Sequence, residues 1–102
     1  MASTPEGKVK AKIKRALDLL REKGYPIYYH MPVQNGMGKP TLDFICCING
    51  HYVGIEAKAP GKKPTERQEA TMAEIRAAEG TTIAFDGSNP KELSACLLML
   101  LK

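Results

Sequence analysis

The dipeptide Asn49-Gly50 constrains the possible folds of this chain more than any other feature. It separates two runs, residues 41–48 and 51–58, that are rich in apolar and β-branched side chains. Both positions of a two-residue hairpin turn need positive φ angles, which asparagine and glycine adopt readily. The sequence therefore predicts a β-hairpin over residues 41–58.

The hairpin turn also fixes which side chains face each other across the two strands. It places Asp43 directly opposite Glu56, and Lys58 follows on the same face because side chains alternate along a strand. Gly54 adjoins Glu56 on this face and is expected to leave open space beside it. Opposed carboxylates destabilise a sheet, and their apolar neighbours indicate a buried setting. Such a pair must share a proton, meet a cation or bind a metal ion.

The periodicity of apolar residues and the helix-boundary signals predict the other elements. Helices are expected from after Ser3 or Thr4 to about residue 23, over 65–78, and from Ser88 or Asn89 to 101; strands are expected over 27–31 and 81–85. The order is αβββαβα, and the crossover through the second helix implies one parallel pair of strands. We therefore expect an α/β domain with a mixed four-stranded sheet flanked by helices.

The size and charge of the chain narrow its class further. A length of 102 residues fits one domain over residues 1–102. The net charge of +4 and the isoelectric point near 9.0 favour an acidic partner such as nucleic acid. No apolar stretch is long enough to span a bilayer, so no membrane partner is expected. Cys46, Cys47 and Cys96 lack zinc-type spacing and no secretory segment is recognisable, which predicts reduced core thiols in a cytoplasmic protein.

The predicted acidic pair offers only oxygen ligands, which suits Mg²⁺ or Mn²⁺. Such an ion would neutralise the pair, polarise a phosphodiester and lower the pKa of a bound water. The ammonium group of Lys58 could orient the attacking water or stabilise charge in the transition state. These residues therefore indicate metal-dependent phosphodiester hydrolysis.

The spacing of these residues resembles a known group of nucleases. Asp43 followed by Glu56-Ala57-Lys58 is similar to the PD-(D/E)xK nuclease core. Three flanking features narrow the resemblance to the virus-type replication-repair nuclease (VRR-NUC) branch. They are Glu6 early in the first helix, the run over residues 54–61, and Gln68 at the start of the following helix.

The VRR-NUC resemblance implies a restriction-endonuclease-like αβββαβα core and a Mg²⁺- or Mn²⁺-dependent endonuclease. Its DNA substrate would be branched or flap-like, selected by structure and not by sequence. The implied metal ligands are Glu6, Asp43, Glu56 and the backbone carbonyl of Ala57, with Lys58 acting in catalysis and Gln68 supporting Lys58 or the water. The resemblance also implies a homodimer, no small-molecule cofactor, and a phage or bacterial origin.

Two of these residues have a simpler structural interpretation. Glu6 fits a capping box in the sequence Ser3-Thr4-Pro5-Glu6, and Gln68 fits another that begins at Thr65. A capping role does not exclude a role at the site, so both interpretations stay open.

Basic residues gather in two places. Lys8, Lys12 and Arg15 share one flank of the first helix, and Lys62, Lys63 and Arg67 follow the predicted hairpin in sequence. We expect both groups to contact DNA phosphates without reading the base sequence. For the first-helix group, a solvated helix surface is an equal alternative.

The last helix is apolar nearly all round, from Leu93 to Leu101. One helix cannot bury every side in a small domain, so a dimer interface is expected there. The alternative is a helix covered by its own domain. Two rival functions stay open as well: a non-catalytic nucleic-acid-binding module of a phage replication or repair assembly, and a structural domain whose partner docks on this helix.

Overall fold

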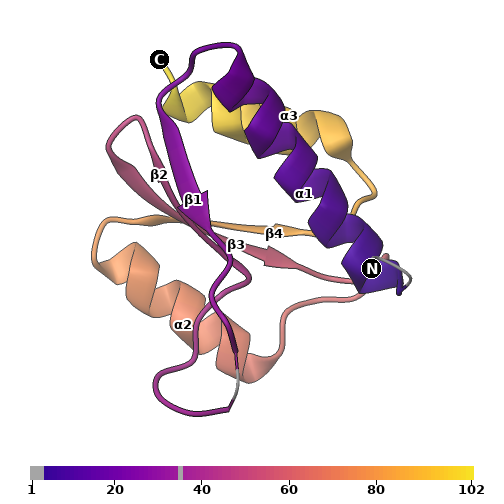
Figure 1. Ribbon diagram of the computed structural model, residues 1–102. Coiled ribbons are helices and arrows are strands. Elements are labelled where there is room, and N and C mark those ends of the chain that lie inside the picture. Colours follow the sequence, from indigo (N-terminus) through magenta and orange to yellow (C-terminus); the bar gives the residue numbers. More distant parts are fainter. Residues whose placement is uncertain (1–3, 35) are drawn as a thin grey trace.

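A four-stranded mixed sheet with the order β1-β2-β3-β4 organises the molecule. The computed structural model describes residues 4–34 and 36–102. Its elements are α1 (Pro5–Glu22), β1 (Ile27–His30), β2 (Phe44–Ile48), β3 (His51–Ala57), α2 (Glu66–Ala77), β4 (Thr81–Phe85) and α3 (Pro90–Leu100) (Figure 1). The first three strands pair antiparallel and β4 pairs parallel with β3. The α/β class, the αβββαβα order and the mixed sheet are therefore confirmed.

The β2–β3 hairpin has the predicted turn and register. Asn49 and Gly50 adopt φ angles of 52° and 84°, and Phe44 pairs with Ile55. The paired segments are shorter than predicted, because β2 begins only at Phe44. Beyond the end of β3, the amide of Lys58 donates to the carbonyl of Phe85, which continues the contact with β4.

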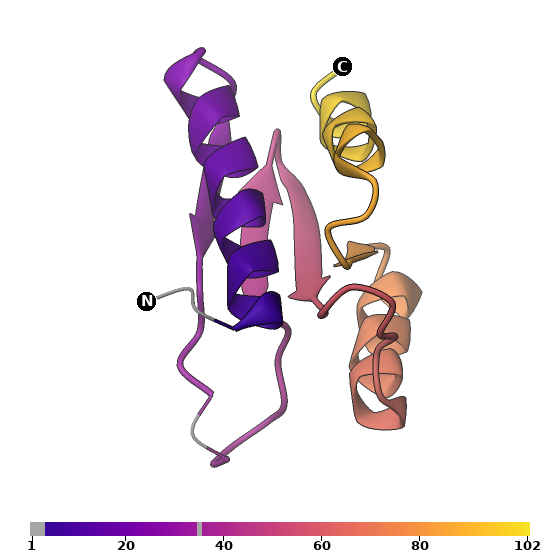
Figure 2. The ribbon, with the colours of Figure 1, turned by 90° about the vertical axis from the view of Figure 1, so that its right-hand side faces the viewer.

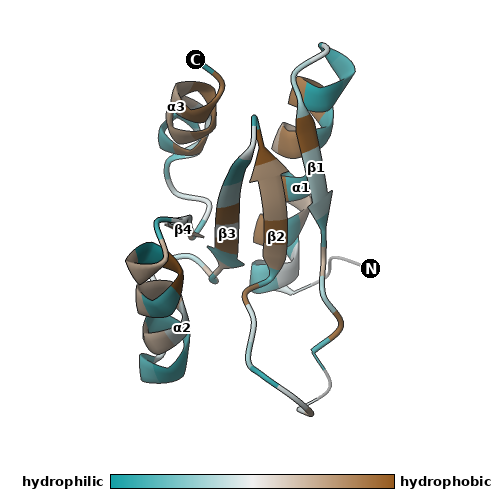
Figure 3. Ribbon diagram, turned by 90° about the vertical axis from the view of Figure 1, so that its left-hand side faces the viewer, coloured by the Kyte–Doolittle hydropathy of each residue, from teal (hydrophilic) through white to brown (hydrophobic). Residues whose placement is uncertain are grey.

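Two helices cover one face of the sheet and one helix covers the other (Figure 1). The larger core lies under α1 and α3, where buried residues of both helices meet the inward side chains of the strands. Its members include Val9, Ile13, Leu17, Phe44, Cys46, Ile48, Val53, Ile55, Phe85, Leu93 and Leu97. The brown colour along β2 marks this apolar content, whereas α2 alternates with hydrophilic teal (Figure 3). The sheet is therefore held mainly from the α1–α3 side.

The α2 side of the sheet depends on a close approach at Gly54. A Cβ atom at this position would lie 2.7 Å from Cδ1 of Leu42 and 3.2 Å from Cδ1 of Ile75. The space that the sequence predicted beside Glu56 is therefore filled by these two apolar side chains. Gly54 serves helix packing and does not leave room for a ligand.

The start of α1 differs from the predicted capping box. The hydroxyl of Thr4 accepts a hydrogen bond from the amide of Gly7 at 2.9 Å, so Thr4 is the N-cap. Glu6 then lies in the first turn but not at the position that closes a box with Thr4. Ser3, the other candidate cap, lies outside the described residues.

The last helix is covered mostly by its own domain. Leu93 and Leu97 are buried, and Leu100 and Leu101 pack against the core. Only Leu98 and Met99 remain exposed on α3 among its large apolar side chains, at 42% and 70%. The expected all-round apolar surface is therefore reduced to these two residues, because the sheet and α1 take up the rest.

The prediction that all three cysteines lie in the core is correct only in part. Cys46 is buried as predicted, but Cys47 is exposed and Cys96 is half-buried, and all three are free thiols. Cys47 points away from the α1–α3 core because side chains alternate along β2. Among the described residues, no helix is both long enough and apolar enough to cross a membrane.

Candidate active site

Asp43 and Glu56 are held together by reciprocal hydrogen bonds. The amide of Asp43 donates to Oε1 of Glu56 at 3.2 Å, and the amide of Ala57 donates to Oδ2 of Asp43 at 2.9 Å. The Glu56 carboxylate thus accepts from the backbone of Asp43, and the Asp43 carboxylate accepts from the residue after Glu56. The two side chains are 7% and 3% exposed. The predicted buried pair of opposed acids is therefore present, one residue beyond the ladder of β2 and β3.

The remaining oxygens of the pair face amides and ammonium groups. Gln34 donates to Oδ1 of Asp43 at 3.2 Å, and the Lys10 ammonium lies 3.5 Å from the same oxygen. On the other carboxylate, Gln68 donates to Oε2 of Glu56 at 2.6 Å. These contacts come from α1, α2 and the segment before β2, so three parts of the chain converge on the pair.

Gln68 connects the pair to Lys58. The Lys58 ammonium donates to Oε1 of Gln68 at 3.0 Å and lies 3.9 Å from a carboxylate oxygen of Glu56 and also of Glu6. The same Oε1 accepts from the amide of Thr65 at 2.9 Å, which closes the capping box of α2. The side chain that caps α2 therefore also forms hydrogen bonds with Lys58 and Glu56.

The buried setting of the acidic pair raises the pKa of Glu56. Burial is the largest cause, the charge of Asp43 adds to it, and together they raise the pKa of Glu56 from 4.5 to about 7. The hydrogen bond from the Asp43 backbone and the charge of Lys58 act in the opposite direction. The local positive groups therefore compensate the two acids only in part, and the pair retains a demand for a proton or a cation.

The donor set suits a hard divalent cation, although it is sparse. Among residues 4–34 and 36–102, no group of three or more His, Cys, Asp or Glu side chains is arranged to hold a metal ion. Asp43 and Glu56 adjoin each other and Ala57, whereas the Glu6 carboxylate contacts the Lys58 ammonium at 3.9 Å. Mg²⁺ commonly uses one or two carboxylates and fills its other positions with water and phosphate. Two buried carboxylates with unmet charge fit that requirement.

Two residues of this cluster were missed from the sequence. Lys10 stands four positions after Glu6 on α1, so the helical repeat places both on one face, and this spacing was a usable signal. Gln34 lies in the irregular segment between β1 and β2. No local pattern predicts where such a segment brings a side chain.

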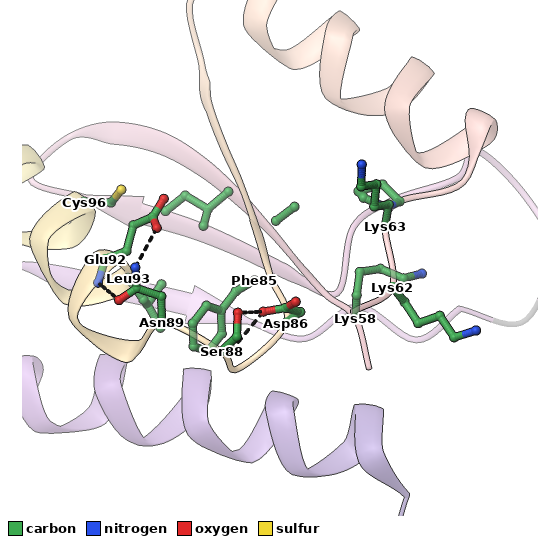
Figure 4. A pocket seen from close by; sticks show the side chains of 13 residues that line it. Lys58, Lys62, Lys63, Phe85, Asp86, Ser88, Asn89, Glu92, Leu93 and Cys96 are labelled. Atoms are coloured by element: carbon green, nitrogen blue, oxygen red, sulfur yellow. Dashed lines mark hydrogen bonds between the residues drawn. The ribbon is translucent and has the colours of Figure 1, made fainter. Parts of the chain in front are cut away.

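The predicted phosphate-binding residues divide into two groups. Lys62 and Lys63 line a cavity of about 270 Å³ together with Lys58 (Figure 4). Arg67 is exposed in the first turn of α2. The three predicted phosphate-binding residues of α1 are exposed too: Lys8, Lys12 and Arg15. Of these, the last two line an apolar groove between α1 and α3.

The sheet order and the acidic pair at the end of its hairpin define an α/β domain of the restriction-endonuclease-like class. Within this class, the chain is similar to a solved structure described as a "VRR_NUC domain", with a TM-score of 0.71 and 16% sequence identity. The match covers 94% of this chain and 97% of the other. The protein therefore has the fold of a VRR_NUC domain. No protein-family model and no curated protein matches its sequence.

Proposed function

We propose that this protein is a metal-dependent nuclease of the VRR-NUC type that hydrolyses phosphodiester bonds in DNA. The observation that carries the proposal is the buried Asp43–Glu56 pair, connected through Gln68 to the ammonium of Lys58. The VRR_NUC fold supports it, and so does the resemblance of Asp43, Glu56 and Lys58 to the PD-(D/E)xK core.

The metal ligands in this proposal are Asp43, Glu56 and the backbone carbonyl of Ala57, with Glu6 completing or extending the set. The ion would be Mg²⁺ or Mn²⁺, since the side-chain ligands are all oxygen. When bound, it would polarise the phosphodiester and lower the pKa of a water. The raised pKa of Glu56 supports this role, because a cation would relieve the repulsion within the pair.

Lys58 is the proposed catalytic cation and Gln68 its positioning residue. The Lys58 side chain is only 13% exposed, and its hydrogen bond to Gln68 restricts its ammonium to the edge of the acidic pair. From there Lys58 orients the attacking water or stabilises charge on the phosphate oxygens. A charge held in a partly buried site acts more strongly than one in bulk water.

The DNA backbone would contact exposed cations around this site. Lys62 and Lys63 flank Lys58, and Arg67 begins the helix that carries Gln68. Such contacts neutralise phosphates and carry no sequence information. Of the α1 cations, Lys8 is the best placed for the same role, since it is exposed near the N-terminus of the helix and does not line the groove between α1 and α3.

A preference for branched or flap-like DNA is part of the proposal. The segment between β1 and β2 carries Val33 and Met37, which are 88% and 82% exposed, and its Gln34 contacts Asp43. Apolar side chains beside a nuclease site can pack against unstacked bases, which branched DNA offers more readily than a regular duplex. The VRR-NUC resemblance further supports a homodimer that acts in DNA repair in the cytoplasm of a phage-infected or bacterial cell.

The test is a cleavage assay with three DNA forms and three ionic conditions. Supercoiled, linear and branched DNA are incubated with the protein in Mn²⁺, Mg²⁺ or EDTA. The proposal predicts cut strands with a divalent cation, none in EDTA, and the fastest cutting on branched DNA. Salt-sensitive DNA binding without any cut strand, unchanged by EDTA, would instead identify a non-catalytic binding module.

A further inference from the structure

A groove between α1 and α3 lies apart from the acidic pair. Its volume is about 690 Å³, and the two helices that form its walls both lie on one face of the sheet (Figures 1 and 2). Its apolar lining consists of Ala16, Leu19, Leu20, Tyr25, Phe85, Pro90, Leu93 and Leu98. Leu19, Tyr25 and Leu98 are 44%, 39% and 42% exposed, so much of this lining meets solvent.

The charged residues of the groove are all cationic. Lys12, Arg15 and Lys23 line it, and no acidic side chain does so among the described residues. Within residues 4–34 and 36–102, none of the three takes part in an ion pair, whereas Lys14 and Arg21 of the same helix both pair with Asp18. The cations beside the groove are therefore available to an acidic partner.

We propose that the α1–α3 groove binds an acidic amphipathic helix of a partner protein. The apolar side of such a helix would cover the groove lining, and its flanking Glu or Asp side chains would meet Lys12, Arg15 and Lys23. This inference goes beyond the proposed nuclease function and does not depend on it.

Two other occupants fit the groove less well. Nucleic acid would meet the cations but would leave the apolar lining without a matching surface. A second copy docked groove to groove would bring two sets of the same three cations together. The acidic helix α2 cannot serve as the ligand of another copy either, because its Met72 is buried on the sheet and no apolar stripe is left to present.

The test uses two designed peptides of about 15 residues, long enough to form a helix on binding. One carries leucines at helical spacing and glutamates elsewhere, and its twin carries lysine at every glutamate position. Fluorescence anisotropy with the full chain measures both, with no DNA or metal present. The acidic peptide is expected to bind about tenfold or more tightly than its twin, and to weaken as salt rises.

Matched variants locate the binding surface. Leu98→Glu and Arg15→Glu should each weaken binding of the acidic peptide by about tenfold. Met99→Glu is the control, because Met99 is also exposed on α3 but does not line the groove. Circular dichroism checks that every variant is folded, and the two independent groove variants guard against a local packing defect in either one.

Several results would overturn the proposal. They are equal affinity for the two peptides, equal weakening by the Met99 and Leu98 variants, and a protein dimer that Leu98→Glu dissociates in the absence of peptide binding. Competition between DNA and the acidic peptide, with DNA binding lost in Arg15→Glu, would reassign the groove to nucleic acid. None of these readouts depends on cleavage, so a failure of the groove proposal and a failure of the nuclease proposal can be told apart.

Discussion

Glu56 and Asp86 lie at the ends of neighbouring parallel strands, but their surroundings shift the two carboxyl groups in opposite directions. Asp86 follows β4 and accepts hydrogen bonds from the hydroxyl and amide of Ser88 and from the amide of Gly61. The bonds from Ser88 are the main reason that its pKa falls from 3.8 to about 2. Glu56 is the residue before the last of β3 and lies beside another acid, and burial raises its pKa to about 7.

The opposite pKa shifts indicate different roles: Asp86 is a structural carboxylate, whereas Glu56 favours binding of a proton or a cation. Asp86 is stabilised in its charged form and ties the segment after β3 to the turn after β4. The charged form of Glu56 is destabilised by its surroundings, and binding of a proton or of a cation would relieve this. Proteins retain such unfavourable arrangements mainly where function requires them. This contrast leads to the following predictions.

The largest expected effect is on DNA cleavage. Asp43→Asn, Glu56→Gln and Lys58→Ala should each lower the cleavage rate by about 1000-fold, the upper range for removing one charge-stabilising group. Asp86→Asn is the matched control, since it neutralises an acid just after the neighbouring strand β4 and should keep most of the activity. If the three site variants still cut at the wild-type rate, the site assignment is wrong.

The second prediction concerns stability and pH without metal. The folded-state pKa of Glu56, about 7, lies above its ordinary value of 4.5, so stability falls as the pH rises through this interval. Glu56→Gln removes this loss, and its free energy of unfolding should exceed that of the wild type by up to about 3 kcal/mol above pH 7. Thermal melts at pH 4.5 and 7.5 measure it.

The control for this experiment is Glu22→Gln, which neutralises an exposed acid at the end of α1. Its melting temperature should keep the same offset from the wild type at both pH values. If the melting temperature of Glu56→Gln also keeps the same offset from the wild type at both pH values, the charge of Glu56 is already compensated in the folded protein.

The features found from the sequence are those that short-range geometry controls. A two-residue Asn49-Gly50 turn leaves one register for the hairpin, and the register alone places Asp43 beside Glu56. Gln68 was identified through the VRR-NUC resemblance, and the fixed spacing of its capping box explains why its side chain lies next to Glu56.

The features missed depend on how distant segments pack. Gln34 reaches Asp43 from an irregular segment, whose path no periodicity describes. Leu97 is buried and Leu98 is exposed because of the way α3 lies on the sheet. The sequence of α3 is apolar on almost every side, so it does not predict which side faces the sheet. Exposure of Cys47 follows from α2 covering only part of its face of the sheet.

A smaller effect distinguishes the two roles of Gln68. Gln68→Ala should lose about 1 kcal/mol of stability through the capping box and also about tenfold in cleavage rate, because Lys58 loses its hydrogen bond. Thr65→Ala removes the side-chain cap alone and should lose a similar stability with nearly full activity. Melting temperatures and initial rates of both variants are compared. Equal activity in the two would reduce Gln68 to a helix cap.

The smallest effect is expected at Asp86. Its lowered pKa means that the charged form stabilises the fold above pH 3.8 and that this contribution is lost as the pH falls toward 2. Asp86→Asn should therefore melt slightly below the wild type at pH 7, with the gap narrowing between pH 4 and pH 2. A gap that widens in acid would show that Asp86 is not held in its charged form.

The central claim is that the Asp43–Glu56 pair binds a divalent cation, and isothermal titration calorimetry with Mn²⁺ at pH 7 tests it most directly. The wild type and Asp86→Asn should bind Mn²⁺ and release protons, because the ion displaces the proton from Glu56. Asp43→Asn and Glu56→Gln should show little or no binding. Mn²⁺ binding of equal strength in all four proteins, or in none of them, would contradict the account.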